Sequence, residues 1–586
     1  MSRKIHRRAI ISAELEQLPA GLHPVLRRIY AARQVGPAEL EPRLATLLPV
    51  GSFRAAAAAA ERLAVARAKG ERIIVIGDFD ADGATATTLA VSTLRALGFD
   101  DVHYLVPDRF RFGYGLSPAI AEQAAKLGPA LLMTVDNGVS SIDGVARANE
   151  LGMQVIVTDH HLPGRERPAA AVMVNPNLPE EDFPGKALAG VGVVFYVMAA
   201  LARELGEAGL VDARQAQRQV LDGLDVVALG TVADLVPLDY NNRILVAEGL
   251  RRMRAGHARP GIQALFRAAG RDISQASSGD LGFGIAPRLN AAGRLDDMSI
   301  GINCLLAPSL QAALPLAEQL DALNRERREL QVRMEGEARA HFEAAKDAVA
   351  REHADAYCLF DPAWHEGVVG LVANRIKDQA RRPVVAFAES GEPGVLKGSA
   401  RSVPGVHIRD TIDAVAARHP GLVLRFGGHA MAAGLSLRAD DLDRFRDALR
   451  EELAAHRELL EQPDVVWSDG DLQPADLGLD LARQLAAAGP WGQAFPEPQF
   501  DSELQVIESR VLKDRHLKMT VRHPAGGQPI DAIAFNQPEL PVGDSLRFVY
   551  RLDVNRYRGL DQPQLVVEYV QAAATQDLQQ HEGTGQ

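Results

Sequence analysis

The chain has 586 residues, of which 47% are hydrophobic and 24% are charged, and its formal net charge is −12. This length predicts about three or four domains with real hydrophobic cores. Proteins that coat duplex DNA are usually basic, so the acidic balance restricts any nucleic-acid contact to a local groove. Cys304 and Cys358 lack CxxC spacing, and no apolar run approaches the roughly 20 residues of a membrane span. We expect a cytoplasmic protein with no disulfide framework, no structural zinc and no membrane association.

The first ten residues, MSRKIHRRAI, are basic but lack the apolar region and cleavage site of a secretory signal. They could touch nucleic acid, but a solvated, frayed terminus is the simpler expectation. Residues 1–50 as a whole predict a helical lead-in, because they contain the segment HPVLRRIYAARQ. Residues 51–260 predict the first α/β domain.

The stretch IIVIGDFDADG, residues 73–83, carries most of the chemical information. An apolar, β-branched run is followed by Asp78, Asp80 and Asp82 at every second position, and then by a glycine. Carboxylates that share one site cannot all ionise comfortably, whereas a bound divalent cation offsets their repulsion. By itself the run is compatible with an acidic surface loop as well as with a cation site.

Three more apolar runs end in residues that can bind a metal. Between them lie alanine-rich segments with helical periodicity, at 117–126 and 144–151. Strands that alternate with helices predict a doubly wound parallel sheet, and ligands of such sheets gather outside the carboxyl ends of the strands. We therefore expect four strand ends to meet at one edge. The three further runs and the residues after them are 130–135 with Asp136, 155–158 with Asp159, His160 and His161, and 225–233 with Asp234.

Residues 261–350 predict a connecting helical region that ends in a long amphipathic linker helix from about 308 to 350. Residues 351–460 predict a second α/β domain. Its expected strands are 356–360, 383–388 and 395–400, and its expected helices lie near 367–380, 408–418 and 440–459.

Residues 461–575 alternate apolar and polar positions between turn signals, which predicts a small antiparallel β-barrel of the OB type. Residues 576–586 are expected to be a disordered tail. Between 509 and 558 the barrel carries nine Lys or Arg against five Asp or Glu. Basic residues and aromatic rings together suit single-stranded nucleic acid, although each ring alone fits a core position better. The aromatic residues are Phe535, Phe548, Tyr550 and Tyr557.

The segments GDFDADG, TVDNG, TDHH and GTVADLVPL, in this order, resemble the four motifs of the DHH phosphoesterase superfamily. Four later segments resemble the RecJ family of bacterial single-strand-specific 5′→3′ DNA exonucleases: PDRFRFGYGLS, FGIAPRLNAAGR, LKGSARS and FGGHAMAAG. The resemblance covers nearly the whole chain and implies a DHH domain, a DHHA1 domain and an OB-type barrel. Only the approach to the first strand, GSFRAAAAAAERL, departs from the family's usual turn-rich pattern.

Six side chains are the candidate metal ligands. Mostly carboxylate sites suit Mg²⁺ or Mn²⁺, and a histidine among them favours Mn²⁺. Their number is sufficient for two divalent ions ~3.5–4 Å apart, which would clamp the attacking and leaving oxygens of a phosphodiester. Asp80, Asp136 and Asp82 are the candidates to bridge both ions. The six ligands are Asp78, Asp80, Asp82, Asp136, His160 and Asp234.

Two histidines are candidates for proton transfer or phosphate binding. His161 would protonate the leaving oxygen or bind phosphate, and the resemblance implies that His429 reaches the scissile phosphate. Asp159 could orient a ligand histidine or simply cap a helix.

The resemblance also implies a set of substrate-binding residues. Ser399 and Arg401 would hold a 5′-phosphate, since an arginine fork binds phosphate bidentately. Arg109 and Tyr114 would meet a phosphate and the first base. For each arginine taken singly, a surface salt bridge is the commoner role. The residues expected to line the path of the strand are Arg288, Asn290 and Arg294.

The function implied by the resemblance is a monomeric two-metal exonuclease that degrades single-stranded DNA to 5′-mononucleotides in recombination and repair. A single-strand-binding protein and a RecQ-type helicase would be its partners. A DHH hydrolase of short oligonucleotides, cyclic dinucleotides or pyrophosphate would not need the linker helix and barrel. A metal-free scaffold would have lost its acids, and a pure single-strand-binding protein would leave the clustered aspartates unexplained.

Overall fold

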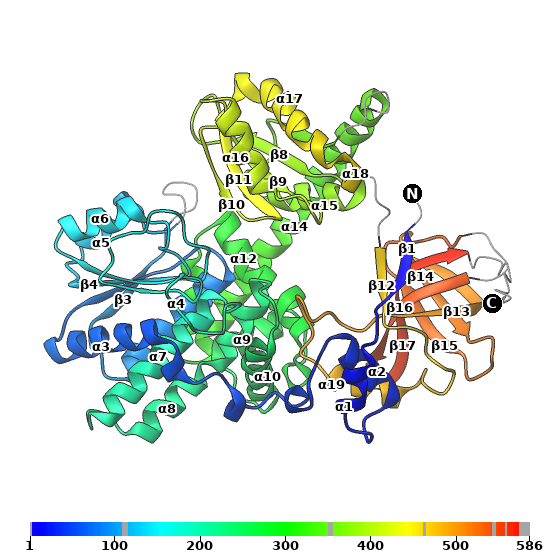
Figure 1. The fold of residues 1–586 in the computed structure, drawn as a ribbon, viewed down its shortest axis with the longest axis horizontal. Helices are drawn as coiled ribbons and strands as arrows, with labels where there is room; N and C mark the ends of the chain where they lie inside the picture. The colour runs from blue at the N-terminus through cyan, green and yellow to red at the C-terminus, as the bar shows by residue number, and fades with distance from the viewer. Residues whose placement is uncertain are drawn as a thin grey trace, which may run out of the picture. The chain divides into compact units, whose positions relative to one another are not determined.

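The computed structural model describes residues 3–107, 115–349, 355–460, 465–541, 546–556 and 560–572. The chain forms two compact units (Figure 1). The larger unit contains Leu47–Val236 and Glu248–Gln462, and the smaller unit contains Met1–Thr46, Pro237–Ala247 and Pro463–Gln586. None of the described helices is long and apolar enough to span a membrane.

A parallel five-stranded sheet in the order β3-β2-β4-β5-β6 begins the larger unit. Helices α5 and α6 share a buried apolar cluster with one face of this sheet, and α3, α4 and α7 lie on the other face (Figure 1). The predicted doubly wound sheet is therefore confirmed. The strands are β2 (Ile73–Ile76), β3 (Val102–Leu105), β4 (Leu131–Val135), β5 (Gln154–Thr158) and β6 (Val172–Val174). The helices are α3 (Arg54–Lys69), α4 (Ala81–Ala96), α5 (Pro118–Ala125), α6 (Ile142–Glu150) and α7 (Gly190–Glu207).

The expectation of a strand at 225–233 is wrong, because this segment is helix α9 (Leu224–Ala233). Most of the helix is buried, and it packs against α4 and α7. A short segment that is apolar on every side shows no helical periodicity, so the pattern could not separate a buried helix from a buried strand. Asp234 consequently lies at the C-cap of a helix and not at the end of a strand.

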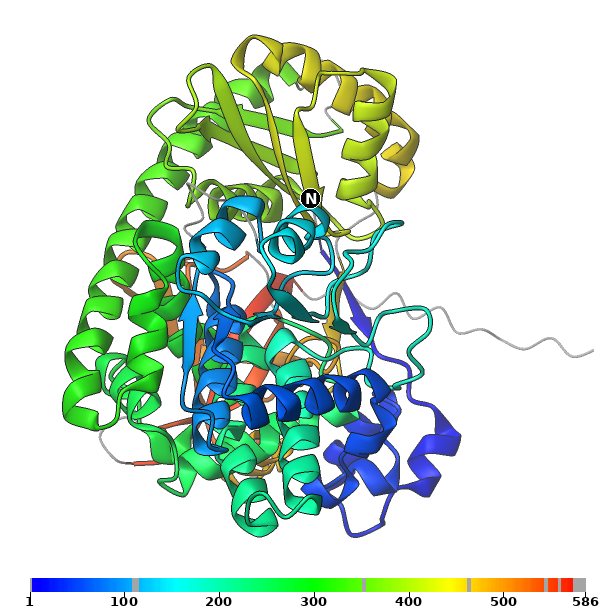
Figure 2. The ribbon, with the colours of Figure 1, turned by 90° about the vertical axis from the view of Figure 1, so that its left-hand side faces the viewer.

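Further helices lead from the first sheet to the second. The predicted linker helix is confirmed as α14 (Leu310–Val349), which packs against α11, α12 and α13 and then, near the second sheet, against α15 (Figure 2). The other helices of this part are α8 (Ala213–Asp222), α10 (Tyr240–Arg254), α11 (Pro260–Ala268), α12 (Ala286–Leu295) and α13 (Ser299–Leu306).

The second sheet has five strands in the order β10-β11-β9-β8-β7, and only the β7–β8 pair is parallel. Helix α15 and part of α14 share one buried cluster with it, and α16 and α17 share another. The three predicted strands are confirmed as β7, β8 and β9, whereas β10 and β11 were not predicted. The elements are β7 (Tyr357–Phe360), α15 (Val369–Ala380), β8 (Val384–Glu389), β9 (Val395–Arg401), α16 (Ile408–Arg418), β10 (Arg425–Gly428), β11 (Ala432–Arg438), α17 (Leu442–Leu453) and α18 (Arg457–Leu460).

The predicted barrel is confirmed as a closed barrel in the order β13-β14-β15-β17-β16, which forms the core of the smaller unit. It is not wholly antiparallel as expected, because β15 and β17 pair in parallel. The expectation of a frayed N-terminus is wrong, because β1 (Lys4–Arg7) pairs in parallel with β12 (Val465–Ser468). The predicted lead-in therefore starts with a strand before its helices α1 (Ser12–Gln17) and α2 (Pro24–Ala32). The other elements are α19 (Leu479–Ala487), β13 (Phe500–Leu512), β14 (His516–Arg522), β15 (Ile530–Ala534), β16 (Leu546–Asn555) and β17 (Gln562–Ala572).

Candidate metal centre and substrate groups

The topology of the first sheet creates a crevice beside β2. The chain moves from β2 to β3 on one side and then returns to β4 on the other, so the connections leave in opposite directions. Such a switch point is where open α/β sheets bind ligands, beyond the carboxyl ends of the strands. Asp78 follows β2, Asp136 follows β4 and His160 follows β5.

The predicted ligands come together at this crevice. They fall into three overlapping groups, and within each group the candidate ligand atoms lie within 4.8 Å of one another. Asp234 reaches the crevice from the end of α9, so its predicted proximity holds although its predicted strand does not. The groups are Asp78 with Asp80 and Asp136, Asp82 with His160 and Asp234, and Asp136 with His160 and His161.

Asp82 is held by the N-terminus of helix α7. The Gly190 N–H donates to its Oδ2 at 2.6 Å, and the Val191 N–H donates to its Oδ1 at 3.0 Å. A Cβ on Gly190 would lie 2.5 Å from Asp136 Oδ1, and a Cβ on Gly230 would lie 2.7 Å from Asp82 Oδ1. Only glycine lets these helix backbones approach the acids so closely. Burial, followed by the charge of Asp80, raises the pKa of Asp82 to about 7.

Asp136 and Asp234, like Asp82, are carboxylates that are shielded from water and lie close to other carboxylates. Burial first, and then the neighbouring carboxylates, raise the pKa of both well above the ordinary value. Asp136 also has a φ of 63°, which is uncommon for a residue other than glycine and is typical of functional sites. A cation among these oxygens would stabilise their ionised forms.

His160 presents an unsatisfied nitrogen to the same acids. Its Nε2 is buried and makes no hydrogen bond to any described residue. It nevertheless lies 3.2 Å from Asp136 Oδ1 and 3.5 Å from Asp234 Oδ2. Burial first, and then the positive charge of His161, lower the pKa of His160 to about 3, so the ring is neutral at pH 7. A buried lone pair facing two carboxylates fits a cation between them, and carboxylates with one imidazole fit Mn²⁺ or Mg²⁺.

Asp159 orients His161. Its Oδ1 accepts a hydrogen bond from His161 Nδ1 at 2.7 Å, and its Oδ2 accepts the Val139 N–H at 2.8 Å. Burial alone would raise the pKa of Asp159, but its bond to His161 and the charge of that ring lower it. Burial would likewise lower the pKa of His161, but Asp159 raises it to about 9. His161 is therefore a cation at pH 7.

His429, in the second sheet's hairpin, stacks on His161. The ring centroids are 5.4 Å apart, and the ring planes differ by 15°. Burial first, and then the charge of His161, lower the pKa of His429. A charged and a neutral imidazole thus lie face to face beside the acidic cluster.

Two asparagines that were not predicted hold the histidine backbone. Asn175 Nδ2 donates to the His161 carbonyl at 2.8 Å, and Asn177 Nδ2 donates to the His160 carbonyl at 2.6 Å. Both follow β6, so a fifth apolar run that ends in polar residues, at 172–174, was the signal that could have found them.

Ser399 and Arg401 form a second polar group on β9. Arg401 Nη1 donates to Ser399 Oγ at 2.8 Å and to the Ala400 carbonyl at 2.8 Å. A Cβ on Gly370, in the first turn of α15, would lie 2.8 Å from both Ser399 Oγ and Arg401 Nη2. The helix start, a hydroxyl and a guanidinium therefore adjoin one another, and these are groups that bind phosphate.

Helix α12 packs against the loop that carries Asp78 and Asp80. Asn290 Oδ1 accepts the Ala81 N–H at 2.8 Å, at the first turn of α4. A Cβ on Gly293 would lie 1.7 Å from the Phe79 carbonyl oxygen, so the helix backbone packs directly on the loop. The observed role of Asn290 is thus to position the loop that carries Asp78 and Asp80.

The remaining candidates differ in their surroundings. Arg288 is 7% exposed and its Nε donates to Asp321 Oδ1 at 3.0 Å, which argues against a direct contact with substrate. Arg294 Nη1 donates to the Gly367 carbonyl at 3.2 Å. Arg109 and Tyr114 lie outside the described residues.

The barrel aromatics separate into core and surface. Phe548 and Tyr550 are fully buried, so they cannot stack on bases. Phe535 is 54% exposed, and its ring centroid lies 5.4 Å from that of His516. Tyr557 lies outside the described residues.

Comparison with known families divides the chain in the same order. The DHH family N-terminal domain matches residues 72–231, the DHHA1 domain matches 354–455, and the RecJ OB domain matches 468–569. The single-stranded-DNA-specific exonuclease RecJ of Dickeya dadantii (strain 3937) is 49% identical over 568 residues, which cover 95% of this chain and 98% of that protein. The chain belongs to the RecJ family. The RecJ of Escherichia coli (strain K12) is 47% identical to this chain, and the alignment covers 95% of this chain and 97% of that protein.

Solved RecJ structures have the same fold. RecJ from Thermus thermophilus in complex with Mn²⁺ superposes with a TM-score of 0.79 at 29% identity, over 97% of this chain and 80% of that chain. The complex of the same protein with Mg²⁺ gives a TM-score of 0.73 at 28% identity, over 97% and 78%. Both of these ions suit the donor set of this RecJ family member.

We expect the stability of the metal-free protein to fall between about pH 6.5 and 9. The raised pKa values of Asp82 and His161 mean that the folded state holds more protons than the unfolded chain, so the free energy of unfolding decreases as pH rises. Below about pH 6.5 the lowered pKa of His160 has the opposite effect, which cancels much of the slope there.

Thermal unfolding at a series of pH values, with EDTA or with Mn²⁺, measures this change in the free energy of unfolding. A fixed concentration of Mn²⁺ equal to about 100 times the Kd at pH 8 should add ~2.7 kcal/mol at that pH. The same concentration should add less at pH 6, because the ligands must lose protons to bind it. Asp136→Asn is the control that should lose this gain. An equal gain in that variant would contradict the assignment.

Asn290→Ala should raise the Kd for Mn²⁺ by about tenfold, because supports behind metal ligands typically contribute that much. Asn290→Asp keeps the acceptor for the Ala81 N–H and should bind Mn²⁺ at least as tightly as the native protein. Titration calorimetry with Mn²⁺ alone measures both. If Asn290→Ala binds Mn²⁺ normally and only loses DNA affinity, Asn290 contacts the strand instead.

Proposed function

We propose that the chain is a 5′→3′ exonuclease that degrades single-stranded DNA to 5′-mononucleotides with two divalent ions, in DNA recombination and repair. Its relatives are named single-stranded-DNA-specific exonucleases. The observation that carries the proposal is the His160 Nε2 without a hydrogen bond within the cluster of aspartates, since that arrangement fits a bound cation. An intact donor set also argues against a metal-free scaffold.

The ions would be held by Asp78, Asp80, Asp82, Asp136, His160 and Asp234. When bound, they supply Lewis acidity that activates water and stabilises charge on the phosphate. Asp82 is grouped with His160 and Asp234, and each of its oxygens accepts one backbone N–H group and keeps a second lone pair for a cation. We propose that it also fixes the loop and adds negative charge close to the ions.

His161 and His429 would act on the substrate. His161 carries a proton at pH 7 and is kept in one orientation by Asp159, so it can donate to a phosphate oxygen or to the leaving 3′-oxygen. His429 stacks on its face and can donate a second hydrogen bond to the same phosphate from its ring N–H. Because the Nδ1 proton of His161 is donated to Asp159, its second ring proton is at a defined atom, Nε2.

Ser399, Arg401 and the start of α15 would hold the terminal 5′-phosphate. Recognition of that end, with the ions at the next phosphodiester, would give digestion from the 5′ end and release of 5′-mononucleotides. The OB barrel would hold the strand further along, as OB folds do. The resemblance implies a single-strand-binding protein and a RecQ-type helicase as partners, and a monomeric enzyme in the cytoplasm.

Asp136→Ala should abolish cleavage and leave strand binding largely intact, because it removes a metal ligand but no strand-binding cation. The assay uses Mn²⁺ with 5′- or 3′-labelled single strands, duplexes and dinucleotides. The native protein should release labelled mononucleotides at once from the 5′-labelled single strand alone. Activity confined to dinucleotides would contradict the proposal, and native turnover by Asp136→Ala would contradict the metal assignment.

Arg401→Ala should lower kcat/KM on 5′-phosphorylated strands about 10- to 100-fold, since a charge-assisted hydrogen bond contributes ~1.5–3 kcal/mol. The effect on strands with a 5′-hydroxyl should be small. Arg438→Ala, at the far end of neighbouring strand β11, is the matched control and should leave both rates unchanged. An equal loss on both substrates would mean that Arg401 does not read the 5′-phosphate.

A further inference from the structure

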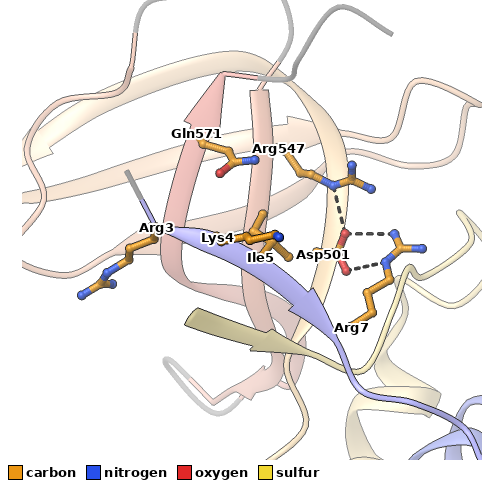
Figure 3. A pocket seen from close by; sticks show the side chains of 7 residues that line it. All are labelled: Arg3, Lys4, Ile5, Arg7, Asp501, Arg547 and Gln571. Atoms are coloured by element: carbon orange, nitrogen blue, oxygen red, sulfur yellow. Dashed lines mark hydrogen bonds and ion pairs between the residues drawn. The ribbon is translucent and has the colours of Figure 1, made fainter. Parts of the chain in front are cut away.

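An open hollow of about 610 Å³ lies on the smaller unit, where strand β1 crosses the barrel (Figure 3). Four cationic side chains and only one carboxylate line it. An amide from the end of β17 completes the polar lining. These residues are Arg3, Lys4, Arg7, Arg547, Asp501 and Gln571.

The single carboxylate does not neutralise the cations. Asp501 is 1% exposed, and Arg7 donates to both of its oxygens at 2.9 Å from Nε and Nη2. Arg547 Nε donates to Asp501 Oδ2, also at 2.9 Å. Two guanidiniums thus share one negative charge, and the hollow keeps a positive excess.

The cations are also accessible. The side chains of Arg7 and Arg547 are 49% and 34% exposed, and each guanidinium has N–H groups that Asp501 does not use. Lys4 is exposed and makes no ion pair with any residue in the described ranges. The Arg3 guanidinium lies 5.7 Å from the ring centroid of Tyr569.

The hollow is separate from the usual binding surface of an OB fold. That surface is formed by the second and third strands with the first and last connections, which here are β14 and β15 and the segments that follow β13 and β16. Arg547 and Gln571 are paired at the opposite end of the β16–β17 hairpin. The hollow also requires β1, which comes from the other end of the chain.

We propose that this hollow binds backbone phosphates of single-stranded nucleic acid, as a second contact beside the β14–β15 face. Arg3 and Arg7 are four residues apart and share one face of the extended chain, which separates them by about 13 Å, so the cations reach further than one phosphate. Guanidinium forks suit phosphate oxygens. The proposal rests on the proposed function for its choice of ligand.

The neighbouring ribbon favours nucleic acid over an acidic peptide. Trp467 on β12 is 46% exposed and lies opposite His6 of β1, on the ribbon face that points away from Asp501. The Arg8 guanidinium lies 5.6 Å from its ring centroid. An exposed indole beside cations can stack on a base, which a peptide of carboxylates would not use.

The test measures binding of 5′-phosphorylated oligothymidylates to the full chain. The chain carries Asp136→Ala, so that it does not cleave the oligonucleotides. The variant carries Arg3→Glu and Lys4→Glu. These substitutions leave the hydrogen bonds that Arg7 and Arg547 donate to Asp501 in place. The control is Arg214→Glu with Arg218→Glu, two exposed cations of helix α8 with the same charge change. Oligonucleotides of about 30 and about 6 nucleotides are compared, because one OB fold occupies roughly 4–16 nucleotides.

The variant should bind the long strand about tenfold more weakly, and the slope of log K against log salt should shrink by about 1.4 for two lost phosphate contacts. The short strand should bind equally well to variant and control. Unchanged affinity for the long strand would overturn the proposal, as would an equal loss for both lengths. Loss of polyglutamate binding with unchanged DNA affinity would overturn it in favour of an acidic peptide.

These outcomes are independent of the proposed polarity and metal chemistry. Cleavage assays of the native protein test those two properties, whereas the hollow is tested by affinity in a protein that does not cleave. Circular dichroism of the variant and the control verifies that both remain folded.

Discussion

Repulsion among buried carboxylates is the constraint around which this molecule is built. Asp82 and Asp136 are nearly inaccessible to water, and Asp234 and Asp80 add further negative charge. Without a cation, burial and mutual repulsion raise the pKa values of the buried acids. A divalent ion removes this cost, and the fold keeps the acids in place for it.

Several separate elements hold those acids. The N-terminus of α7 donates two backbone hydrogen bonds to Asp82, and α12 holds the first loop through Asn290. Asp159 fixes His161, which in turn stacks on His429 from the second sheet. The chemical groups of both sheets thereby meet at one edge of the parallel sheet.

The order of the elements and much of the site could be predicted from the sequence. Asp78, Asp136 and His160 directly follow apolar runs, and parallel strands bring such residues to one edge. The segment before Asp234 was assigned to the wrong element, because a helix buried on all sides has no polar face to show its period. The prediction that Asp234 lies near the other ligands is nevertheless correct, because a strand or a helix in this place would end near the crevice.

The support of the site could not be predicted, because it depends on contacts between distant segments. Gly190 contacts acids more than 50 residues away, and no local pattern marks it. Asn290 lies in a recognised segment but was assigned to the path of the strand, whereas it binds a loop 209 residues away. The pairing of β1 with β12 joins residues more than 450 positions apart. Phe548 and Tyr550 lie beside basic residues in the sequence, which suggested a nucleic-acid surface, but both side chains are buried in the core of the barrel.

Anomalous diffraction at the manganese edge, from crystals grown with Mn²⁺, tests the central claim most directly. The account predicts two peaks roughly 3.5–4 Å apart, coordinated by Asp78, Asp80, Asp82, Asp136, His160 and Asp234. His160 Nε2 should be within bonding distance of one of them. No peak in the crevice, or a manganese ion that leaves His160 Nε2 without a ligand bond, would contradict it.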